Sequence, residues 1–578
     1  MSSAMTREAG GPVSSSGHTG FGQYFTPPPI AEFMARLVSV APPDRVLDPA
    51  CGSADLLVAA DVVSAHGGGN MQLTLCGIDI SNAAVQSSMA NVENRQRASI
   101  FAGDSLKLVA ELEGRHDVVL CNPPFASSMR EGRKDVLSSF ALGAQSGGAS
   151  KVTLDLQEVG MLFIELCLRS LVPGGRAAVV VPNGYLGNRS VRYVVFRRWL
   201  LLHARIAAIV GLPRFAFHHS GADVSASLVV FERRAHPISD LAQTERQPFF
   251  CALAERVGWR LQGRRGSETL RPAPDGRGAR PSGGAPTPDS DFEALLDQLF
   301  KSGVPEHFSW MRADAAYKIL NVSNRESADA DIELASGASA GADEQTPTLR
   351  DVIGRRDRSC DPKLWCPKHL NVRRAVRSVS HLELGSVIRP VPYRFLRKKE
   401  AIGIYRYVAI EDIHEAVGAY EWKECLAHEL PGRARLVAAV GDIFIANIWS
   451  SAGKWMLAGS DANDGRLIVT SGCAHFELIP SSEDLLGDLV FGLCSEAFKV
   501  QMRALATGSD GLSTISVEDL RSIAVPRPQS GGVRAEFDRR ITEMHKGQIV
   551  LPFLVRDELA AVAPVADIRP RHSHVGQV

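Results

Sequence analysis

The sequence predicts an α/β protein, in which a doubly wound, mostly parallel sheet is followed by a second, mixed α+β domain. Between residues 21 and 235, short apolar runs alternate with helix-like stretches, which is typical of parallel strands joined by covering helices. From residue 346 onward the pattern changes to closely spaced β-rich runs with a late helical stretch. The composition, 45% hydrophobic and 22% charged over 578 residues, indicates a globular chain of several domains and excludes a fibrous or wholly disordered one.

The expected strands of the first domain are short apolar runs. In chain order they are Arg45–Asp48, Thr74–Asp79, Asp117–Cys121, Ala177–Pro182 and Ala226–Glu232. Two stretches carry an apolar residue every three or four positions and are expected as helices, Pro29–Val38 and Asp155–Leu171. Asp155 is expected to be the N-cap of the second helix, and Pro173-Gly174-Gly175 to stop it.

Composition also divides the chain into units. The first 20 residues are rich in Gly and Ser and are expected to form a disordered tail, and two low-complexity stretches, 263–290 and 327–344, are expected to be disordered loops. The expected units are the tail 1–20, a first domain 21–235, its extension 236–345, a second domain 346–528, and a C-terminal helix and tail 529–578. In the second domain we expect strands in Tyr405–Ile410 and Asp442–Ile448 and helix near Leu486–Ala504.

Charge and hydropathy narrow the class of function. The chain has 64 Lys and Arg and 64 Asp and Glu, so a nucleic-acid partner would require a local basic patch. Residues 351–400 have such an excess, with 13 Lys or Arg against 5 Asp or Glu. This excess suits contacts to DNA phosphates, and a solvated charged face is the alternative. No run approaches 18 uninterrupted apolar residues, so we expect no transmembrane helix and no membrane partner.

The ten cysteines are sparse and follow no pattern, which is typical of buried thiols in a reducing cytosol. We therefore expect a cytoplasmic protein. Cys360, Cys366 and His369 lie close together in the sequence, but their spacing is not one that zinc sites usually have, and no metal site is expected.

Acidic residues close three successive strand-like segments. After Asp48, the small residues Ala50, Gly52 and Ser53 let the backbone approach a ligand closely at the carboxyl end of the first strand. Asp79 can accept hydrogen bonds from ribose hydroxyls, and Asp104 from an exocyclic amine. Each acid alone could be a helix N-cap, but their recurrence at successive strand ends argues for a ligand site.

The fourth strand-like segment ends in Asn122-Pro123-Pro124-Phe125. Two prolines fix the backbone and remove two donors, so the Asn122 side chain and the carbonyl before a proline converge as acceptors. Such a pair can hold an NH2 group, while the ring of Phe125 can stack on a flat base. A rigid turn with a core phenylalanine is the structural alternative.

Together these segments resemble the amino-methylating DNA methyltransferases of the γ arrangement. In that family a Phe/Tyr-Thr-Pro segment, here Phe25-Thr26-Pro27, precedes the cofactor turn and the Asn-Pro-Pro-aromatic segment. The chain is most similar to the modification subunits of type I restriction systems and to the TaqI-type enzymes. The resemblance implies an S-adenosylmethionine-dependent methyltransferase sheet that methylates adenine at N6, the base being flipped out of double-stranded DNA.

The resemblance also implies roles for individual residues. The implied S-adenosylmethionine contacts are Phe25, Thr26 and Pro27 at the methionine end, Asp48, Ala50, Gly52 and Ser53 in the turn, Asp79 at the ribose and Asp104 at the adenine amine. Asn122, Pro123, Pro124 and Phe125 are implied to hold the target adenine, and Phe217 to stack on its other face. Plain core packing is the alternative for Phe217. Ala54 replaces the glycine that the family usually has, and its methyl group could tighten the cofactor turn.

The second domain resembles one target-recognition domain of a type I specificity subunit. The resemblance rests on short motifs in order, at 441–446, 469–472, 501–508, 515–520 and 523–528, leading toward a helix at 537–545. It implies a modification subunit fused to half a specificity subunit. It also implies a restriction-modification or phage-defence setting, with a possible homodimer or restriction and specificity partner subunits.

Three alternatives stay open. Cytosine-N4 methylation uses a similar loop, usually with Ser in the place of Asn122. RNA or protein methylation is a second alternative, against which the target-recognition-like domain argues. A DNA-binding specificity protein with an inactive methylase half is the third, which Ala54 leaves open.

Overall fold

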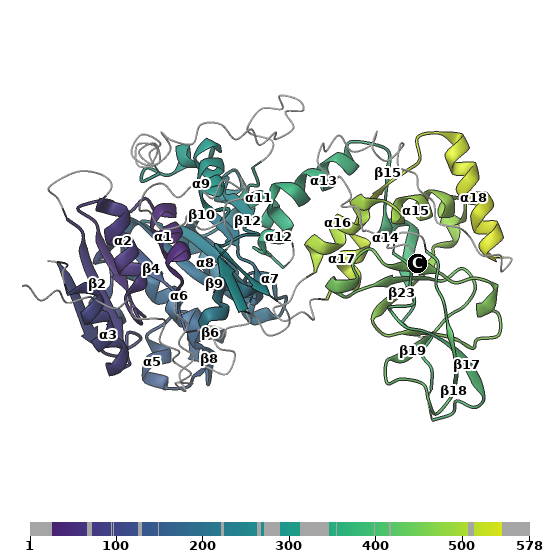
Figure 1. The fold of residues 1–578 in the computed structure, drawn as a ribbon, viewed down its shortest axis with the longest axis horizontal. Coiled ribbons are helices and arrows are strands. Elements are labelled where there is room, and N and C mark those ends of the chain that lie inside the picture. Colours follow the sequence, from purple (N-terminus) through teal and green to yellow (C-terminus); the bar gives the residue numbers. More distant parts are fainter. Residues whose placement is uncertain are drawn as a thin grey trace, which may run out of the picture.

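The computed structural model of the chain has two lobes that lie side by side (Figure 1). The structure describes residues 26–65, 72–93, 95, 97–124, 130–147, 150–220, 225–262, 267–270, 290–311, 346–353, 355, 357–392, 394–397, 399–415, 418–506 and 514–545. The expected tail 1–20, the expected loop 327–344 and the end of the chain after residue 545 lie outside these residues. In the described part of the chain, no helix has both the length and the apolar character needed to cross a bilayer.

The first lobe is built on an eight-stranded sheet in the order β12-β10-β11-β9-β4-β1-β2-β3. The strands are β1 (Arg45–Asp48), β2 (Thr74–Asp79), β3 (Ala98–Ala102), β4 (His116–Cys121), β9 (Leu171–Pro182), β10 (Ala204–Gly211), β11 (Ala226–Arg233) and β12 (Phe250–Leu253). Only β11 runs antiparallel to its neighbours within this sheet. The other strands therefore end at one common edge, and the strand order reverses between β1 and β4, where open α/β sheets place their ligands.

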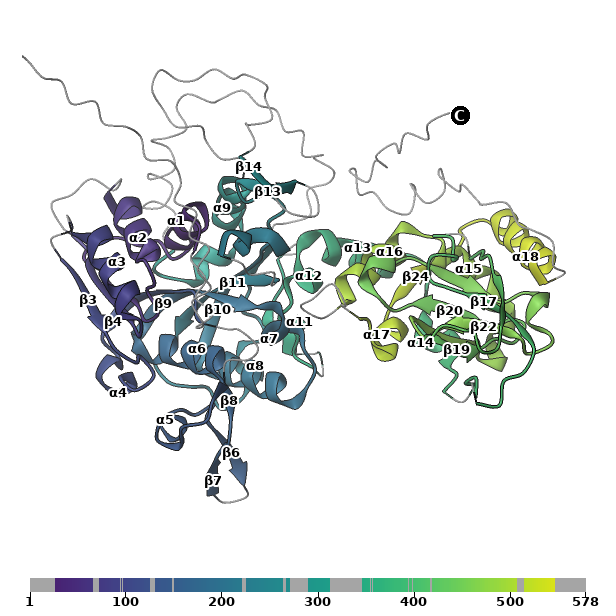
Figure 2. The same ribbon diagram turned by 60° about the horizontal axis from the view of Figure 1, so that its bottom comes forward.

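Helices cover both faces of the sheet, as Figure 2 shows. One face carries α1 (Pro28–Leu37), α2 (Asp55–Ala65) and α9 (Phe292–Lys301), and the other carries α6 (Val159–Ser170) and α8 (Val191–His203). The residues of β4 alternate between the two apolar clusters, since Val118 and Leu120 face the first and Val119 and Cys121 the second. Burial on both faces explains why this strand is an uninterrupted apolar run.

Further helices complete the outer part of the first lobe. They are α3 (Asn82–Val92) and α4 (Val109–Leu112), beside β2 and β3, and α7 (Asn183–Gly187), directly after β9. The N-cap of α3 is Ser81, whose hydroxyl accepts a hydrogen bond from the backbone N–H of Ala84 (3.3 Å).

A small subdomain projects from the first lobe between β4 and α6 (Figure 2). Its elements are β5 (Arg130–Glu131), α5 (Lys134–Ser138), the hairpin of β6 (Ala144–Gly147) and β7 (Ser150–Thr153), and β8 (Gln157–Glu158). The prediction of a helix from Asp155 was wrong at its start, because β8 occupies that stretch and Glu158 is the N-cap of α6. Asp155 is exposed and forms an ion pair with Lys134 (2.7 Å).

The end of α6 also differs from the prediction. The helix ends at Ser170 and β9 begins at the next residue, so Pro173-Gly174-Gly175 lies inside the extended β9 segment and does not stop the helix. Gly174 has a φ of +78°, a conformation that favours glycine.

The chain between the lobes contributes to the first lobe. After β12 it forms the β13–β14 hairpin (Trp259–Gln262 and Ser267–Leu270), so part of the expected loop 263–290 is a strand, and residues 263–266 and 271–289 lie outside the description. Phe292 of α9 stacks on Phe33 of α1, with ring centroids 4.4 Å apart. Next come α11 (Leu349–Ile353), α12 (Pro362–Trp365) and α13 (Pro367–Arg377), the last two lying between the lobes (Figure 1).

The second lobe is mixed α+β. Its two four-stranded sheets have the orders β16-β23-β20-β21 and β18-β17-β22-β19, and a small sheet pairs β15 with β24. Its strands are β15 (His381–Glu383), β16 (Ile388–Pro390), β17 (Ile404–Val408), β18 (Lys423–Leu426), β19 (Ala434–Val437), β20 (Ile443–Ala446), β21 (Trp455–Leu457), β22 (Leu467–Thr470), β23 (Cys473–Leu478) and β24 (Ala524–Pro526). Its helices are α14 (Leu384–Val387), α15 (Leu486–Leu493), α16 (Glu496–Leu505), α17 (Val517–Arg521) and α18 (Gly531–His545).

The helical stretch expected near Leu486–Ala504 is two helices, α15 and α16. The break falls at Cys494 and Ser495, where the Ser495 hydroxyl accepts a hydrogen bond from the N–H of Phe498 (3.2 Å) and caps α16.

Candidate functional site

The carboxyl ends of β1, β2 and β4 bring the chemistry-bearing residues of the first lobe to one edge. Asp48 ends β1, Asp79 ends β2, and Asn122 follows β4. A small cavity of about 20 Å³ at this edge is lined by Thr26, Asp48, Ala50, Cys51, Gly52, Ser53, Asp55, Leu56 and Asn122. Six residues predicted from three separate segments of the sequence therefore meet around one space.

Asp48 is almost completely buried, with an exposed fraction of 1%. Its carboxylate accepts a hydrogen bond from the N–H of Ala50 (3.1 Å). Burial above all, together with the nearby charges of Asp79 and Asp55, raises the pKa of Asp48 to about 8, although this hydrogen bond opposes the rise. A cationic group beside Asp48 would favour its ionised form, so the site suits a positively charged ligand.

Two residues of the turn after Asp48, Gly52 and Ala54, have a positive φ. Gly52 has a φ of +51°, and its N–H donates to Asp79 Oδ2 (2.9 Å). Ala54 has a φ of +65°, which is uncommon for a residue with a Cβ atom and explains why glycine suits this position. The Ala54 side chain packs in the apolar cluster with α1 and α2 and does not line the cavity.

Asp79 supports the turn through both of its carboxylate oxygens. Oδ2 accepts the N–H of Gly52 (2.9 Å), and Oδ1 accepts the N–H of Ser81 (2.8 Å). The N-cap alternative does not apply to Asp79, since Ser81 is the N-cap of α3. Asp79 thus joins the end of β2 to the turn at the end of β1.

Side chains of α3 and of the loop after β3 also hold this turn, and sequence reasoning missed them. Ser88 donates to the carbonyl of Gly52 (2.5 Å), Asn91 to that of Ser53 (2.9 Å) and Ser105 to that of Pro49 (2.6 Å). These partners lie 36 or more residues from the turn in the sequence, so no local pattern identifies them.

Asp104 lies after β3 and is held from two sides. Its Oδ1 accepts the N–H of Leu106 (3.2 Å), and Arg133 forms an ion pair with its Oδ2 (2.8 Å). Arg133 also pairs with Glu131 (2.6 Å) and, through hydrogen bonding above all, keeps the pKa of Glu131 below its usual range although burial opposes this. Asp104 does not line the small cavity, and its partner Arg133 was not among the predicted residues.

Asn122 is buried at the end of β4 and is oriented by Thr26. Its amide nitrogen donates to the Thr26 hydroxyl oxygen (3.1 Å), which joins two segments 96 residues apart. Pro27 and Pro123 are also buried, and Pro124 is half-buried. Phe25 and Phe125, predicted at the methionine end of the cofactor and at the target base, lie outside the described residues.

Phe217 is placed differently from the other predicted residues. It lies in a short 3₁₀ segment, Arg214–Ser220, with an exposed fraction of 2%, and packs in the apolar cluster on the α1 face of the sheet. In this conformation its ring is a core side chain, so stacking on a base would require the segment to move.

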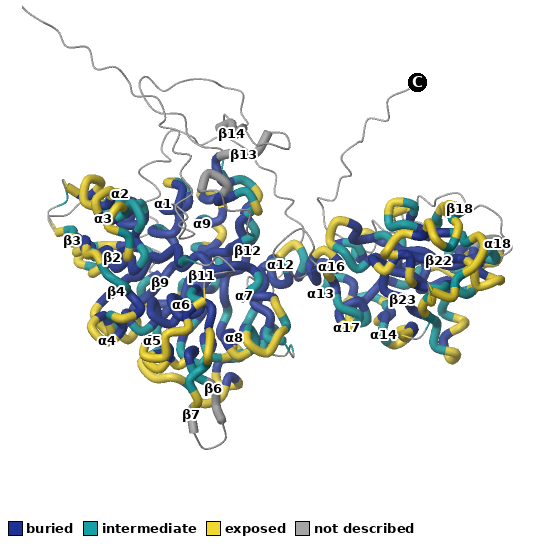
Figure 3. Tube along the Cα trace, turned by 90° about the horizontal axis from the view of Figure 1, so that it is seen from below, coloured by how far each residue is buried: buried dark blue, intermediate teal, exposed yellow. Residues whose placement is uncertain are grey.

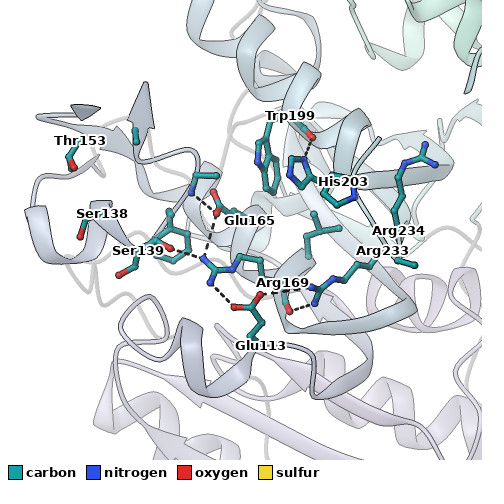
Figure 4. A pocket seen from close by; sticks show the side chains of 16 residues that line it. Glu113, Ser138, Ser139, Thr153, Glu165, Arg169, Trp199, His203, Arg233 and Arg234 are labelled. Atoms are coloured by element: carbon teal, nitrogen blue, oxygen red, sulfur yellow. Dashed lines mark hydrogen bonds and ion pairs between the residues drawn. The ribbon is translucent and has the colours of Figure 1, made fainter. Parts of the chain in front are cut away.

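A larger pocket of about 480 Å³ opens at the opposite edge of the sheet, and no predicted residue lines it (Figure 4). Its walls include Trp199 stacked on His203, with ring centroids 4.6 Å apart, and Arg169 paired with Glu113 (2.7 Å). Glu165 accepts the N–H groups of Ala141 and Leu142 (2.7 and 2.8 Å). These charged groups are engaged in holding α6 to its surroundings.

The Cys360, Cys366 and His369 cluster is taken up in packing. The Cys366 thiol lies 3.4 Å from Nδ1 of His369, which also contacts the carbonyl of Lys363, and Cys360 Sγ lies 3.7 Å from the carbonyl of Arg358. Within the described residues, no group of three or more His, Cys, Asp or Glu side chains could hold a metal ion.

The sheet order and the antiparallel β11 define the first lobe as an α/β fold with a doubly wound, mostly parallel sheet. Residues 14–247 match the family described as N-6 DNA Methylase, so the match covers most of this lobe, including the turn after Asp48 and the segment Asn122–Phe125.

Known proteins resemble parts of the chain. The methylase subunit of the type I restriction enzyme EcoEI from Escherichia coli is 26% identical over 203 residues, which are 34% of this chain and 40% of that subunit. The ribosomal RNA small subunit methyltransferase C of E. coli is 33% identical over 113 residues, 19% of this chain and 30% of that enzyme. A modification subunit of a putative type I restriction enzyme from Vibrio vulnificus YJ016 has 24% identity and a TM-score of 0.34, covering 43% of this chain and 50% of that one. The chain thus spans less than half the length of the EcoEI subunit.

Proposed function

We propose that this chain is a site-specific DNA methyltransferase that transfers a methyl group from S-adenosylmethionine to N6 of a flipped adenine. The observation that carries the proposal is the position of Asn122-Pro123-Pro124 directly after β4, where Asn122 lines the same cavity as the Asp48 turn. The match of residues 14–247 to the N-6 DNA Methylase family supports the chemistry.

S-adenosylmethionine would supply an electrophilic methyl group on a positively charged sulfonium. The residues that would hold it are Phe25, Thr26 and Pro27, the turn from Asp48 to Ser53, and the strand-end acids Asp79 and Asp104. The buried carboxyl of Asp48 fits a cationic ligand, because a positive charge would offset the unfavourable burial of the ionised acid.

Asn122 would act on the nucleophile. Adenine N6 is a poor nucleophile because its lone pair is delocalised into the ring. Hydrogen bonds from N6 to Asn122 Oδ1 and to the Pro123 carbonyl would localise that lone pair, and positioning would supply most of the rate. Thr26 fixes the amide by accepting from its nitrogen, so the amide oxygen is directed by a contact that is already formed.

The second lobe would recognise the DNA sequence. Several basic residues of the 351–400 segment are engaged elsewhere, since Arg355 pairs with Asp357 and Arg394 with Asp442. Lys368, Arg374, Arg397 and Lys399 are exposed and could contact phosphates. The setting would be a cytoplasmic restriction-modification or phage-defence system, with a second copy or restriction and specificity subunits as partners.

The test is long-read sequencing, sensitive to modified bases, of DNA from a methylation-free host that expresses the chain alone. N6-methyladenine in one sequence motif is expected, and Asn122→Ala should abolish it while binding of S-adenosylmethionine, measured by calorimetry, is retained. N4-methylcytosine would instead favour the cytosine alternative. Methylation of ribosomal RNA without methylation of DNA would contradict the proposal, as would full activity of Asn122→Ala.

A further inference from the structure

Arg189 lies at the same edge of the sheet as Asn122. It follows α7, which begins directly after the carboxyl end of β9, and it precedes Ser190 at the start of α8. Because β9 pairs in parallel with β4, the loop that carries Arg189 and the loop that carries Asn122 leave the sheet on one side.

The guanidinium of Arg189 reaches into the second lobe. It contacts the hydroxyl of Ser516 and the carboxylate of Asp519, the N-cap and third residue of α17, and lies 3.3 Å from Asp357 Oδ2. Arg355 contacts the same two acids, Asp357 at 3.0 Å and Asp519 at 3.3 Å. Arg189, Arg355, Asp357 and Asp519, here named the hinge cluster, therefore join three segments of the chain.

Three members of the hinge cluster are largely shielded from water, and the fourth, Arg189, is 31% exposed. The side chains of Asp519, Asp357 and Arg355 are only 7%, 11% and 16% exposed. Burial opposes ionisation of Asp357, but the hydrogen bond and charge of Arg355, with Arg189 nearby, hold its pKa below the usual range. The two arginines balance the charges of the two acids. Removing Arg189 would leave Arg355 as the one cation of the cluster for two shielded carboxylates.

The segment that follows the hinge cluster, residues 357–377, contacts both lobes. The Cys360 N–H donates to the Leu186 carbonyl (2.8 Å), and the Arg197 guanidinium donates to the carbonyls of Asp357 (2.6 Å) and Tyr185 (2.8 Å). A Cβ at Gly187 would lie 3.0 Å from Asp361 Oδ2, so the two segments approach closely. From there α12 packs on β12 and β10, and α13 packs on α16 and β24.

We propose that the hinge cluster is a positioning device that fixes the second lobe at one angle to the catalytic edge and thereby sets which base reaches Asn122. The inference rests on the proposed function, because it assumes that the second lobe holds DNA. Its physical reason is that the ionic contacts to α17 start from the loop beside the site, so a change at Arg189 moves the two lobes relative to each other. A displacement of about 1 Å is enough to lower a transfer rate by orders of magnitude.

The first experiment measures lobe orientation without any activity. Spin labels introduced through noncanonical amino acids at the exposed residues Met89 and Leu426, one in each lobe, report the distance distribution by pulsed electron resonance. Arg189→Ala is expected to broaden the distribution, and Arg189→Lys to restore much of the wild-type width. Arg45→Ala, which breaks the Arg45–Asp117 pair (2.8 Å) within the first lobe, is the matched control and should leave the width unchanged. A distribution for Arg189→Ala identical to wild type would overturn the proposal.

The second experiment measures methylation by the full chain on a DNA substrate that contains the recognised motif. For Arg189→Ala we expect kcat to fall at least about tenfold, while the KM for DNA and the affinity for S-adenosylmethionine stay within about twofold, with neighbouring adenines newly modified. Unchanged kcat at the same single adenine would overturn the role in positioning. A wild-type chain that methylates no DNA would refute the proposed function instead, and the distance measurement would still decide whether the cluster fixes the lobes.

Discussion

Asp48 combines nearly complete burial with a position at the start of the turn that we propose holds the cofactor. A carboxyl group in this environment is protonated more easily than one in water, and its pKa is raised to about 8, mainly by burial. The consequence is that the charge of Asp48 depends on what binds beside it. A cation in the cavity would draw the group into its ionised form and lower its pKa.

This coupling predicts a pH dependence of cofactor binding. Between pH 6 and 8 the free protein holds a proton on Asp48, so binding of cationic S-adenosylmethionine is expected to release it, and the affinity should fall by up to about tenfold per pH unit below pH 8. Calorimetry in two buffers of different ionisation enthalpy measures the released proton. Asp48→Asn is the control, in which this release should disappear. Equal proton release by wild type and Asp48→Asn would contradict the assignment.

Ala54 occupies a backbone conformation that glycine adopts more easily, at a φ of +65° and with its methyl group buried. Ala54→Gly should change the free energy of unfolding by less than about 1 kcal/mol, because relief of the left-handed backbone is offset by the greater freedom of glycine in the unfolded chain. Ala54→Val should lower it by about 2 kcal/mol or more, since a β-branched side chain fits neither the φ nor the packed surroundings.

Urea denaturation measures both Ala54 variants. Because the methyl group does not line the cavity, the affinity of Ala54→Gly for S-adenosylmethionine should match wild type. A large gain of affinity in Ala54→Gly would mean that the methyl group does obstruct the turn, as the sequence comparison with the family suggested.

At the scale of elements, α3 supports the turn after Asp48 through hydrogen bonds from its side chains. Ser88 is fully buried, and its hydroxyl donates to the Gly52 carbonyl. Ser88→Ala leaves that carbonyl without this donor, so the free energy of unfolding should fall by about 1 kcal/mol and the affinity for S-adenosylmethionine by several-fold. Chemical denaturation and calorimetry measure the two effects. Ser87→Ala, on the exposed side of the same helix, is the matched control and should behave as wild type, and identical behaviour of the two variants would refute a supporting role for α3.

Several elements could be predicted from the sequence because they are buried on both faces. The strands expected at Arg45–Asp48 and Thr74–Asp79 match β1 and β2, and the one expected at Asp117–Cys121 begins one residue earlier in the structure. By contrast, β3 lies at the edge of the sheet and is largely exposed, so its run Ala98–Ala102 has no continuous apolar pattern. The start of α6 could not be predicted, because the residues before it form β8, which pairs with β5 about 26 residues earlier in the chain and is not marked by a local pattern.

The candidate site also contains residues that could be predicted from the sequence and residues that could not. The turn, the strand-end acids and Asn122 could be predicted because each lies within a few residues of a strand end. Their partners Ser88 and Arg133 could not, because these residues meet them only through the tertiary fold. Thr26 was predicted as a cofactor contact, but its hydrogen bond to Asn122 was not. Phe217 shows the opposite failure, since a motif assigned it to the base while its ring packs in the core.

At the scale of the whole molecule, the two lobes share one apolar cluster that runs through α12. Trp365 is its largest residue there, with an exposed fraction of 1%, and its indole N–H donates to the Ser359 carbonyl (2.9 Å). In Figure 3, buried residues lead from the first lobe through α12 toward the second. Shared burial of this kind favours unfolding of both lobes in one cooperative step.

Trp365→Ala should therefore remove about 3–5 kcal/mol and separate the unfolding of the two lobes. Scanning calorimetry is expected to show one transition for the wild type and two for the variant. Trp422→Ala, at an exposed tryptophan of the second lobe, should keep a single transition and serves as the control. A single transition in Trp365→Ala would mean that the lobes are coupled by other contacts.

The close approach at Gly187 and Gly211 has a practical consequence for anyone who wants to re-target the chain. A Cβ at Gly211 would lie 2.6 Å from Leu253 and 3.0 Å from Pro362. There is therefore no room for larger side chains or inserted residues where the chain enters α12. A chimera that exchanges the C-terminal lobe should thus keep residues up to α12 from this chain and place its crossover within α13. The incoming lobe would also need a carboxylate in the place of Asp519 of α17 to accept Arg189. Without it, the orientation of the new lobe relative to the first would not be fixed by this contact.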